Sequence, residues 1–169
     1  WANKYVLQGG LQWSPRALPA DLVLEMTAVH PWTYTHKYNF ASYAHHGSDL
    51  GFSYGPNTRL FSAKLNYDLS AKHRVSLAFD HLLEGADSVN VGGVWFPVGG
   101  EVNQNYEERS LALDNATTWL MGDITATNSL RLEWLYRWRN QLSFLSGCEL
   151  RNVQGNTDLY YSLQINLNY

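Results

Sequence analysis

The sequence predicts an all-β fold, an antiparallel transmembrane β-barrel of the outer-membrane type, and three observations predict it. Apolar and polar residues alternate along segments of about ten residues, as expected for strands with two unlike faces. Short and long connections alternate between these segments. The last segment keeps its alternation as far as a terminal aromatic residue, Tyr169.

The composition excludes several other classes of protein. The chain has 169 residues, enough for one domain. Only 16% of them are charged, but 14% are aromatic, which argues against disorder. No stretch approaches the ~18 uncharged apolar residues of a membrane-spanning helix. The net charge of -3 gives no nucleic-acid signal, and the single cysteine, Cys148, excludes an internal disulfide.

The alternation predicts seven strands, of which the last is the most regular. They cover residues 5–13, 22–28, 61–69, 75–80, 107–125, 130–139 and 159–169. Within 107–125 the apolar residues of the two halves are out of phase, so we expect a β-bulge near Asp114 and Asn115. No segment of helical period separates the strands, which argues against a parallel α/β fold.

The expected connections are of two kinds. Short ones cover residues 14–20, 70–73 and 126–129, and long ones cover about 29–57, 83–106 and 141–156. Short turns at one end and long loops at the other are typical of outer-membrane barrels. The terminal aromatic residue, with apolar residues at every second position before it, resembles the C-terminal signal of bacterial outer-membrane proteins. We therefore expect a periplasmic C-terminus and extracellular long loops.

Seven strands are too few to close a single-chain barrel. Such barrels usually have an even number of strands, and an open sheet edge is not viable in lipid. We therefore expect residues 1–169 to be the C-terminal portion of one larger barrel domain whose N-terminal part is missing.

Charged residues fall mainly on one face of the expected strands, which would line the lumen. The clearest row is Arg131, Glu133, Arg137 and Arg139. This row is either a stripe that attracts acidic polysaccharide or small anions, or a set of ion pairs with acidic residues of neighbouring strands. The acidic residues considered as partners are Glu25, Asp68, Asp80 and Asp114. A soluble barrel or sandwich predicts the same alternation with its apolar face inward, but the aromatic residues opposite the charges favour a membrane.

The first long loop carries the most distinctive motif. It contains Pro31-Trp32-Thr33-Tyr34-Thr35-His36, then Asn39, Tyr43, His45, Gly47, Leu50-Gly51 and Gly55-Pro56-Asn57. This pattern resembles the capsule assembly protein Wzi family of Gram-negative bacteria. The resemblance implies an outer-membrane barrel of about eighteen strands. It also implies a lectin-like, non-catalytic surface role in which the protein holds capsular polysaccharide on the cell.

The aromatic, histidine and asparagine residues of the long loops are candidates for a glycan-binding surface. Aromatic faces offer rigid contact area for sugar rings, and the polar groups can bond hydroxyls. The candidates are Trp32, Tyr34, His36, Tyr38, Asn39, Tyr43, His45, His46, Trp95 and Phe96. The alternative is that they pack the loops into the mouth of the barrel.

The remaining expectations concern chemistry and partners. His30, His36, His45 and His46 match no zinc-binding spacing, and adjacent strand residues such as Glu107 and Glu108 would point to opposite faces. We expect no metal, no cofactor and no enzyme activity. The expected partners are capsular or surface polysaccharide, outer-membrane lipid and lipopolysaccharide, and other outer-membrane proteins, but not nucleic acid. A porin-like channel and a structural subunit of an outer-membrane protein complex remain alternative functions.

Overall fold

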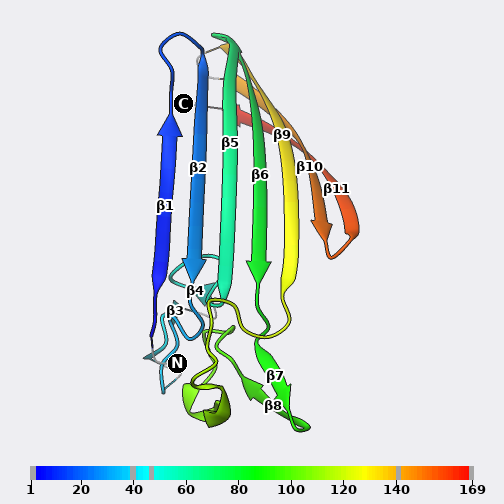
Figure 1. Cartoon of the computed structure of the whole chain (residues 1–169). Coiled ribbons are helices and arrows are strands. Elements are labelled where there is room, and N and C mark those ends of the chain that lie inside the picture. Colours follow the sequence, from blue (N-terminus) through cyan, green and yellow to red (C-terminus); the bar gives the residue numbers. More distant parts are fainter. Residues whose placement is uncertain (1–2, 39–40, 46–47, 140–141, 168–169) are drawn as a thin grey trace. The chain divides into compact units, whose positions relative to one another are not determined.

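The computed structural model describes residues 3–38, 41–45, 48–139 and 142–167, which form an all-β structure. Seven strands make one antiparallel sheet, shown in Figure 1. They are β1 (Val6–Trp13), β2 (Ala20–Val29), β5 (Thr58–Ser70), β6 (His73–Glu84), β9 (Thr125–Arg139), β10 (Leu142–Val153) and β11 (Asn156–Leu167). Two small hairpins, β3 (Ala44–His45) with β4 (Ser48–Asp49) and β7 (Ser88–Val91) with β8 (Val94–Pro97), lie in the loops.

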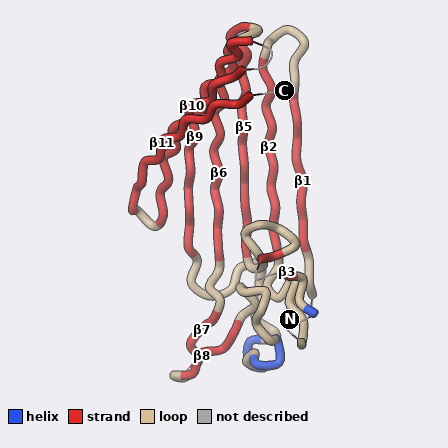
Figure 2. Tube along the Cα trace, turned by 180° about the vertical axis from the view of Figure 1, so that it is seen from behind, coloured by secondary structure: helices blue, strands red, loops and turns tan. Residues whose placement is uncertain are grey.

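The strand order in the sheet follows the chain, β1-β2-β5-β6-β9-β10-β11. Figure 2 shows the same neighbours from the opposite side. The prediction of an all-β, antiparallel fold is therefore confirmed. The number of strands in the sheet agrees as well, although one predicted strand is loop and one observed strand, β10, was not predicted. The sheet is not closed, since β1 and β11 form its two edges, and the complete barrel stays a prediction.

Three parts of the predicted map of strands and connections are wrong. The expected short connection over residues 126–129 lies inside β9. The expected strand over residues 107–125 is loop almost throughout, with two 3₁₀ turns, η2 (Tyr106–Glu108) and η3 (Leu111–Leu113). The expected long loop over 141–156 is mainly strand β10, which a two-residue turn at Gln154 and Gly155 joins to β11. These two residues have φ values of 49° and 92°, as a tight hairpin turn of this kind requires. Cys148 consequently lies in a strand and not in a loop.

Within the described ranges, helical geometry occurs in these two 3₁₀ turns and at residue 41. No helix among the described residues is long and apolar enough to cross a membrane.

The chain divides into two compact units. The loop unit comprises Trp1–Gln8, Met26–Leu60 and Leu82–Ala126. The sheet unit comprises Gly9–Glu25, Phe61–His81 and Thr127–Tyr169. The buried hydrophobic side chains of the described residues all belong to the loop unit, and are Ala28, Val29, Trp32, Leu82, Val98 and Val102.

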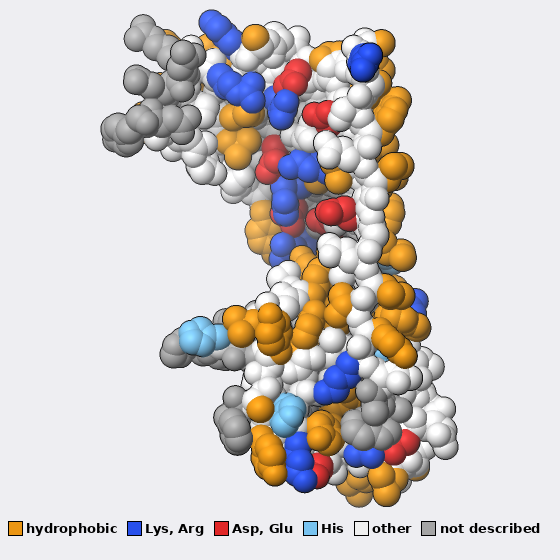
Figure 3. Space-filling view, turned by 90° about the vertical axis from the view of Figure 1, so that its left-hand side faces the viewer, with side chains coloured by type: hydrophobic (Ala, Val, Ile, Leu, Met, Phe, Trp, Pro, Cys, Tyr) orange, Lys and Arg blue, Asp and Glu red, His pale blue; other side chains and the backbone are white. Residues whose placement is uncertain are grey.

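The sheet unit segregates its side chains by chemistry, as the alternation predicted. Along β10, Cys148 pairs with Leu132 on β9 and Tyr161 on β11, while the next residue, Glu149, pairs with Arg131 and Tyr160. With the exception of Arg59, each Asp, Glu, Lys and Arg of the seven sheet strands occupies a position of the polar face by this alternation. Figure 3 shows these charged side chains gathered together, with hydrophobic side chains along one border of the sheet.

Ion pairs and hydrogen bonds join the strands across the polar face. Glu149 accepts hydrogen bonds from Arg131 at 3.0 Å and from Arg151 at 3.0 Å. Asp68 accepts two from Arg74, both at 2.7 Å. The acidic partner of Arg131 is thus a β10 residue that the predicted map had assigned to a loop. Pairing with a neighbouring strand, one of the two alternatives for this row, is what the geometry shows for Arg131.

The apolar face of the sheet unit is uncovered. Tyr161 is 77% exposed and Leu163 is 76% exposed, and large hydrophobic side chains of β5, β6 and β9 are also exposed. Near the short-turn end, aromatic rings contact one another in a cluster that we call the aromatic belt. Its members are His73, Trp134, Tyr136, Trp138 and Phe144. The His73 ring is nearly parallel to the rings of both Trp134 and Tyr136, with centroids 5.7 and 4.8 Å away.

Candidate functional site

Trp32 packs the loop unit internally. Its side chain is only 3% exposed, and its backbone N–H donates to the carbonyl of Gly99 at 3.0 Å. A Cβ at Gly99 would overlap the Trp32 backbone nitrogen and indole, so this glycine allows the two loops to approach. Trp32 therefore offers no face to a sugar, and its assignment to the glycan surface is corrected.

Asn57 joins three segments of the loop unit and was missed as a site residue. Its buried side-chain amide donates to the carbonyls of Ala86 at 3.0 Å and Met121 at 3.1 Å, and accepts from the Met121 N–H at 2.8 Å. Its own carbonyl accepts from the Gly85 N–H at 2.9 Å. Asn57 adopts a φ of 58°, a region that asparagine tolerates better than most residues. The Gly55-Pro56-Asn57 motif was the sequence signal for this position.

Four aromatic residues of the first long loop form what we call the tyrosine platform. It consists of Tyr34, Tyr43, Phe52 and Tyr54. The Tyr34 and Tyr43 rings lie 5.8 Å apart, and the Phe52 and Tyr54 rings 5.6 Å apart. The Phe52 N–H donates to the Tyr34 hydroxyl at 3.2 Å, which links the two pairs. Tyr43 and Tyr54 are exposed, whereas Tyr34 and Phe52 are half-buried.

Tyr34 has a second role as a support. Its φ of 73° is unusual for a bulky residue, and its ring lies directly against Gly51, where a Cβ would clash. The Tyr43 N–H donates to the Tyr34 carbonyl at 2.8 Å. Tyr34 thus fixes the position of Tyr43, and Tyr43 presents the more open aromatic face.

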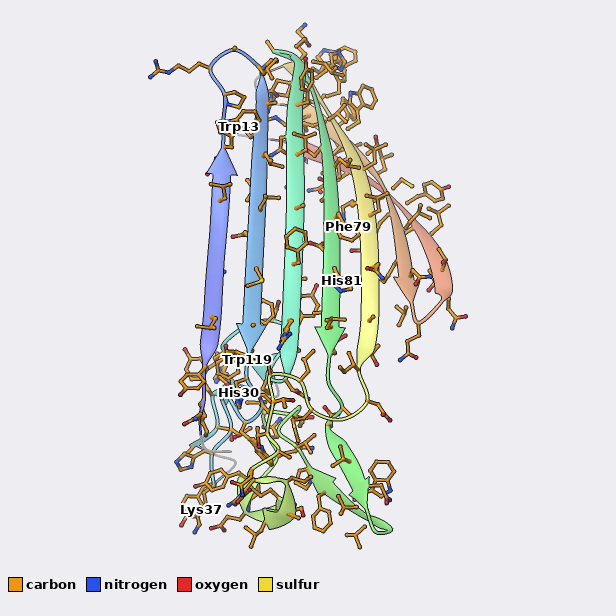
Figure 4. All side chains as sticks on the ribbon, viewed as in Figure 1. Trp13, His30, Lys37, Phe79, His81 and Trp119 are labelled. Atoms are coloured by element: carbon orange, nitrogen blue, oxygen red, sulfur yellow. The ribbon has the colours of Figure 1, made fainter. Side chains whose placement is uncertain are left out.

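A polar group lies in the same loop unit. The rings of His36 and Tyr38 are 6.0 Å apart, and the Nδ1 atom of His36 accepts from the Tyr38 N–H at 3.2 Å. Lys37 forms an ion pair with Glu107 at 2.6 Å, and this carboxylate raises the pKa of Lys37. Lys37 lies at the outer part of the loops in Figure 4. The pair links the first loop to the η2 turn. Glu107 and Glu108 both lie in this 3₁₀ turn, so the strand expected at these residues is wrong.

His30 lies inside an aromatic cluster of the loop unit, beside Trp119 in Figure 4. Its ring meets those of Tyr5 and Trp119 edge-on, at 6.0 and 5.4 Å, and its Nδ1 lies 3.1 Å from the Pro31 carbonyl. Burial lowers the pKa of His30, because the charged imidazolium loses hydration there. In contrast, His36 and His45 are exposed.

The second predicted contact element is the β7–β8 hairpin. Gly92 and Gly93 have φ values of 62° and 90°, which fit a tight two-residue turn, and the Asn90 side chain accepts from the Gly93 N–H at 2.9 Å. Trp95 is 67% exposed, while Phe96 is half-buried. Because Trp95 pairs with Asn90 across the hairpin, an indole and an amide stand on the same side of it.

The structure thus divides the predicted surface residues into three groups. His36, Tyr38, Tyr43, His45 and Trp95 are exposed. Trp32 is buried, and Tyr34 and Phe96 are partly covered. Asn39 and His46 lie outside the described residues. For the lumen row, Glu133 is half-buried and Arg137 is exposed, and the Arg137 guanidinium donates to the Ala71 carbonyl at 3.4 Å. The side chain of Arg139 is outside the described set.

The candidate site in the described part of the loop unit consists of exposed aromatic faces and not of a deep cavity. A hollow of about 10 Å³ lies among Trp32, Val98, Arg109 and Met121, and this is room for one water molecule at most. Within the described residues, no group of three or more His, Cys, Asp or Glu is placed to hold a metal ion. No protein-family model, curated protein or solved structure matches this chain.

Proposed function

We propose that this chain is part of an outer-membrane β-barrel whose extracellular loops bind surface polysaccharide without catalysing a reaction. The observation that carries the membrane placement is the segregation of the sheet unit. The charges of its strands lie on one face and include the ion pairs Arg74–Asp68, Arg131–Glu149 and Arg151–Glu149, while its apolar face is uncovered. A soluble sheet would need to bury that face, whereas lipid solvates it directly.

The aromatic belt supports the same placement. Tryptophan and tyrosine are enriched where a barrel passes from hydrocarbon to head groups. His73 is the first residue of β6 and Trp138 is the last but one of β9, so the belt lies next to the short turns. This placement assigns the end of β11 and the short turns that join β1 to β2 and β5 to β6 to the periplasm, and it assigns the loop unit and the β10–β11 turn to the cell exterior.

The tyrosine platform and the hairpin support polysaccharide binding. Exposed aromatic faces next to amide, imidazole and hydroxyl groups suit sugar rings, which present C–H faces and hydroxyl edges. Tyr43, Tyr54 and Trp95 supply such faces on elements that hydrogen bonds hold in place. An open platform also suits a long polymer, which cannot enter a closed pocket.

The test is retention of the surface polysaccharide purified from the bacterium that carries the protein, by the full-length protein folded in detergent. We expect Tyr43→Ala with Tyr54→Ala to lower retention at least about tenfold, the loss of roughly 1.4 kcal/mol. The control is Tyr67→Ala, an exposed tyrosine of the sheet unit. Unchanged retention in the platform variant, with folding verified by heat-modifiable gel migration, would contradict the binding site. Trp32→Ala is unsuitable because Trp32 is part of the packing.

A further inference from the structure

Two small residues interrupt the row of large side chains on the apolar face of β10. The positions of this face along the strand are Leu142, Phe144, Ser146, Cys148 and Leu150. Ser146 and Cys148 are adjacent positions of one face, about 7 Å apart along the strand. The result is a depression in the middle of an otherwise bulky face.

Large residues of both neighbouring strands form the walls of this depression. Ser146 pairs with Trp134 on β9 and Leu163 on β11. Cys148 pairs with Leu132 and Tyr161 in the same way. We call this feature the β10 groove. It has a volume of about 330 Å³, and Gly147 and Ser162 complete its lining.

The chemistry of the groove excludes a charged ligand. None of the described residues that line it is Asp, Glu, Lys or Arg, and the charges of these strands, such as Arg131 and Glu149, alternate onto the opposite face. Its walls are one leucine and one aromatic residue on each side. The complement of such a surface is an uncharged, apolar and narrow group.

The size of the groove decides between a lipid and a protein as its occupant. A stable protein interface uses about 20–30 residues on each side, whereas eight residues line this groove. Strands lie about 4.8 Å apart, so the walls on β9 and β11 are separated by about 10 Å at the backbone, and their side chains narrow this space further. A single hydrocarbon chain fits these dimensions.

We propose that the β10 groove binds one acyl chain of a membrane lipid. The inference rests on the proposed membrane placement and is independent of polysaccharide binding. The chain lies along β10, over Ser146 and Cys148, and contacts the side chains of Trp134 and Tyr161. The residence time of this lipid in the groove would exceed that of the lipids that contact the rest of the apolar face.

The experiment uses the full-length protein in vesicles of phosphatidylethanolamine and phosphatidylglycerol. The probe is a phosphatidylethanolamine that carries a photoactivatable diazirine in one acyl chain. After illumination, mass spectrometry locates the labelled peptides. We expect labelling at residues 132–134, 146–148 and 161–163 to exceed labelling of β5 residues 61–69 several-fold.

Matched variants separate the groove from the rest of the face. Ser146→Leu with Cys148→Leu fills the groove and should reduce its labelling to the level of β5. Ala63→Leu makes a similar enlargement on β5, at a position of the same apolar face, and should leave groove labelling unchanged. Because the wild-type map alone already tests the proposal, it does not depend on the folding of the double variant.

Each other outcome has a distinct meaning. Equal labelling of all the strands would overturn the groove but agree with the membrane placement. No labelling of the apolar face would overturn both the groove and the membrane placement. Protein–protein cross-links in place of lipid adducts at residues 146–148 would show a protein occupant and overturn the acyl-chain site.

Discussion

At the residue scale, backbone conformation separates the side chains that hold the loops together from those that face outward. Trp32 and Tyr34 adopt φ values of 65° and 73° and are covered, whereas Tyr43 and Trp95 are exposed. All four are aromatic loop residues, so their type and spacing could not distinguish them in the sequence. The distinction depends on long-range partners such as Gly99, which only the folded chain brings together.

Asn57 should be the most sensitive polar residue of the loop unit. Asn57→Ala removes three side-chain hydrogen bonds and leaves the Met121 N–H and two carbonyls without them. An unsatisfied buried group costs about 1–3 kcal/mol, so we expect the free energy of unfolding of the loop unit to fall by at least about 2 kcal/mol. Urea unfolding followed by tryptophan fluorescence measures it. Asn115→Ala, at an exposed position, is the control, and equal effects of the two changes would contradict the role of Asn57.

His30 should make the loop unit less stable in acid. Because burial lowers its pKa, the unfolded chain binds a proton first as the pH falls below about 6.5. The stability that neutral His30 contributes is therefore present above that pH and declines as the pH falls toward the lowered pKa of the folded state. We expect the free energy of unfolding to decrease between about pH 8 and about pH 5.

A difference measurement isolates this histidine. Burial raises the pKa of Asp87, and the charge of Glu101 adds to this effect. The Asp87 carboxyl therefore affects stability in the opposite direction to His30, because its contribution is lost as the pH rises. His30→Phe retains an aromatic ring but cannot titrate, and the contribution of Asp87 cancels between wild type and variant. The stability difference between them should change with pH in the stated direction. A difference that is constant with pH would show that His30 does not titrate as a buried group.

At the scale of elements, the sequence predicted the strands with unbroken alternation and failed where the alternation was interrupted. β11 was predicted nearly to its ends, whereas β9 was predicted only from Leu130 onward although it begins at Thr125. β10 was missed because Ser146, Gly147 and Cys148 break its apolar row. Residues 107–125 were assigned to a strand although Leu113 and Leu120 are out of phase, and that change of phase marks the 3₁₀ turns and loop that the structure contains.

The approach of the first loop to the β7–β8 hairpin should depend on Gly99. Gly99→Ala would bring a Cβ into the backbone and indole of Trp32, and we expect it to expose the loops to limited proteolysis. Gly92→Ala is a matched control, because Gly92 also has a positive φ but nothing lies near its Cβ position. Backbone strain is common to both variants, so the excess effect of Gly99→Ala reports the close contact. Similar proteolysis of the two variants would contradict this role.

At the scale of the whole molecule, the sequence predicted the two unlike faces of the sheet, and the structure pairs the residues accordingly. The alternation of apolar and polar residues that produces these faces is local, so it can be recognised in a single sequence. The pairing of the strands is not local, and in the structure it leaves β1 and β11 as the two edges of the sheet. Likewise, the partner of Arg131 depended on the position of β10, which the alternation did not reveal.

The central claim is that the apolar face of the sheet meets lipid. The most direct test places a nitroxide spin label at each position from 157 to 167 of β11, one at a time, in the full-length protein in lipid vesicles, and measures collision with oxygen and with a water-soluble nickel complex. The account predicts high oxygen accessibility and low nickel accessibility at odd positions, including Tyr161 and Leu163, and the reverse at even positions. Low accessibility to both reagents at the odd positions would show that protein covers this face and would contradict the account.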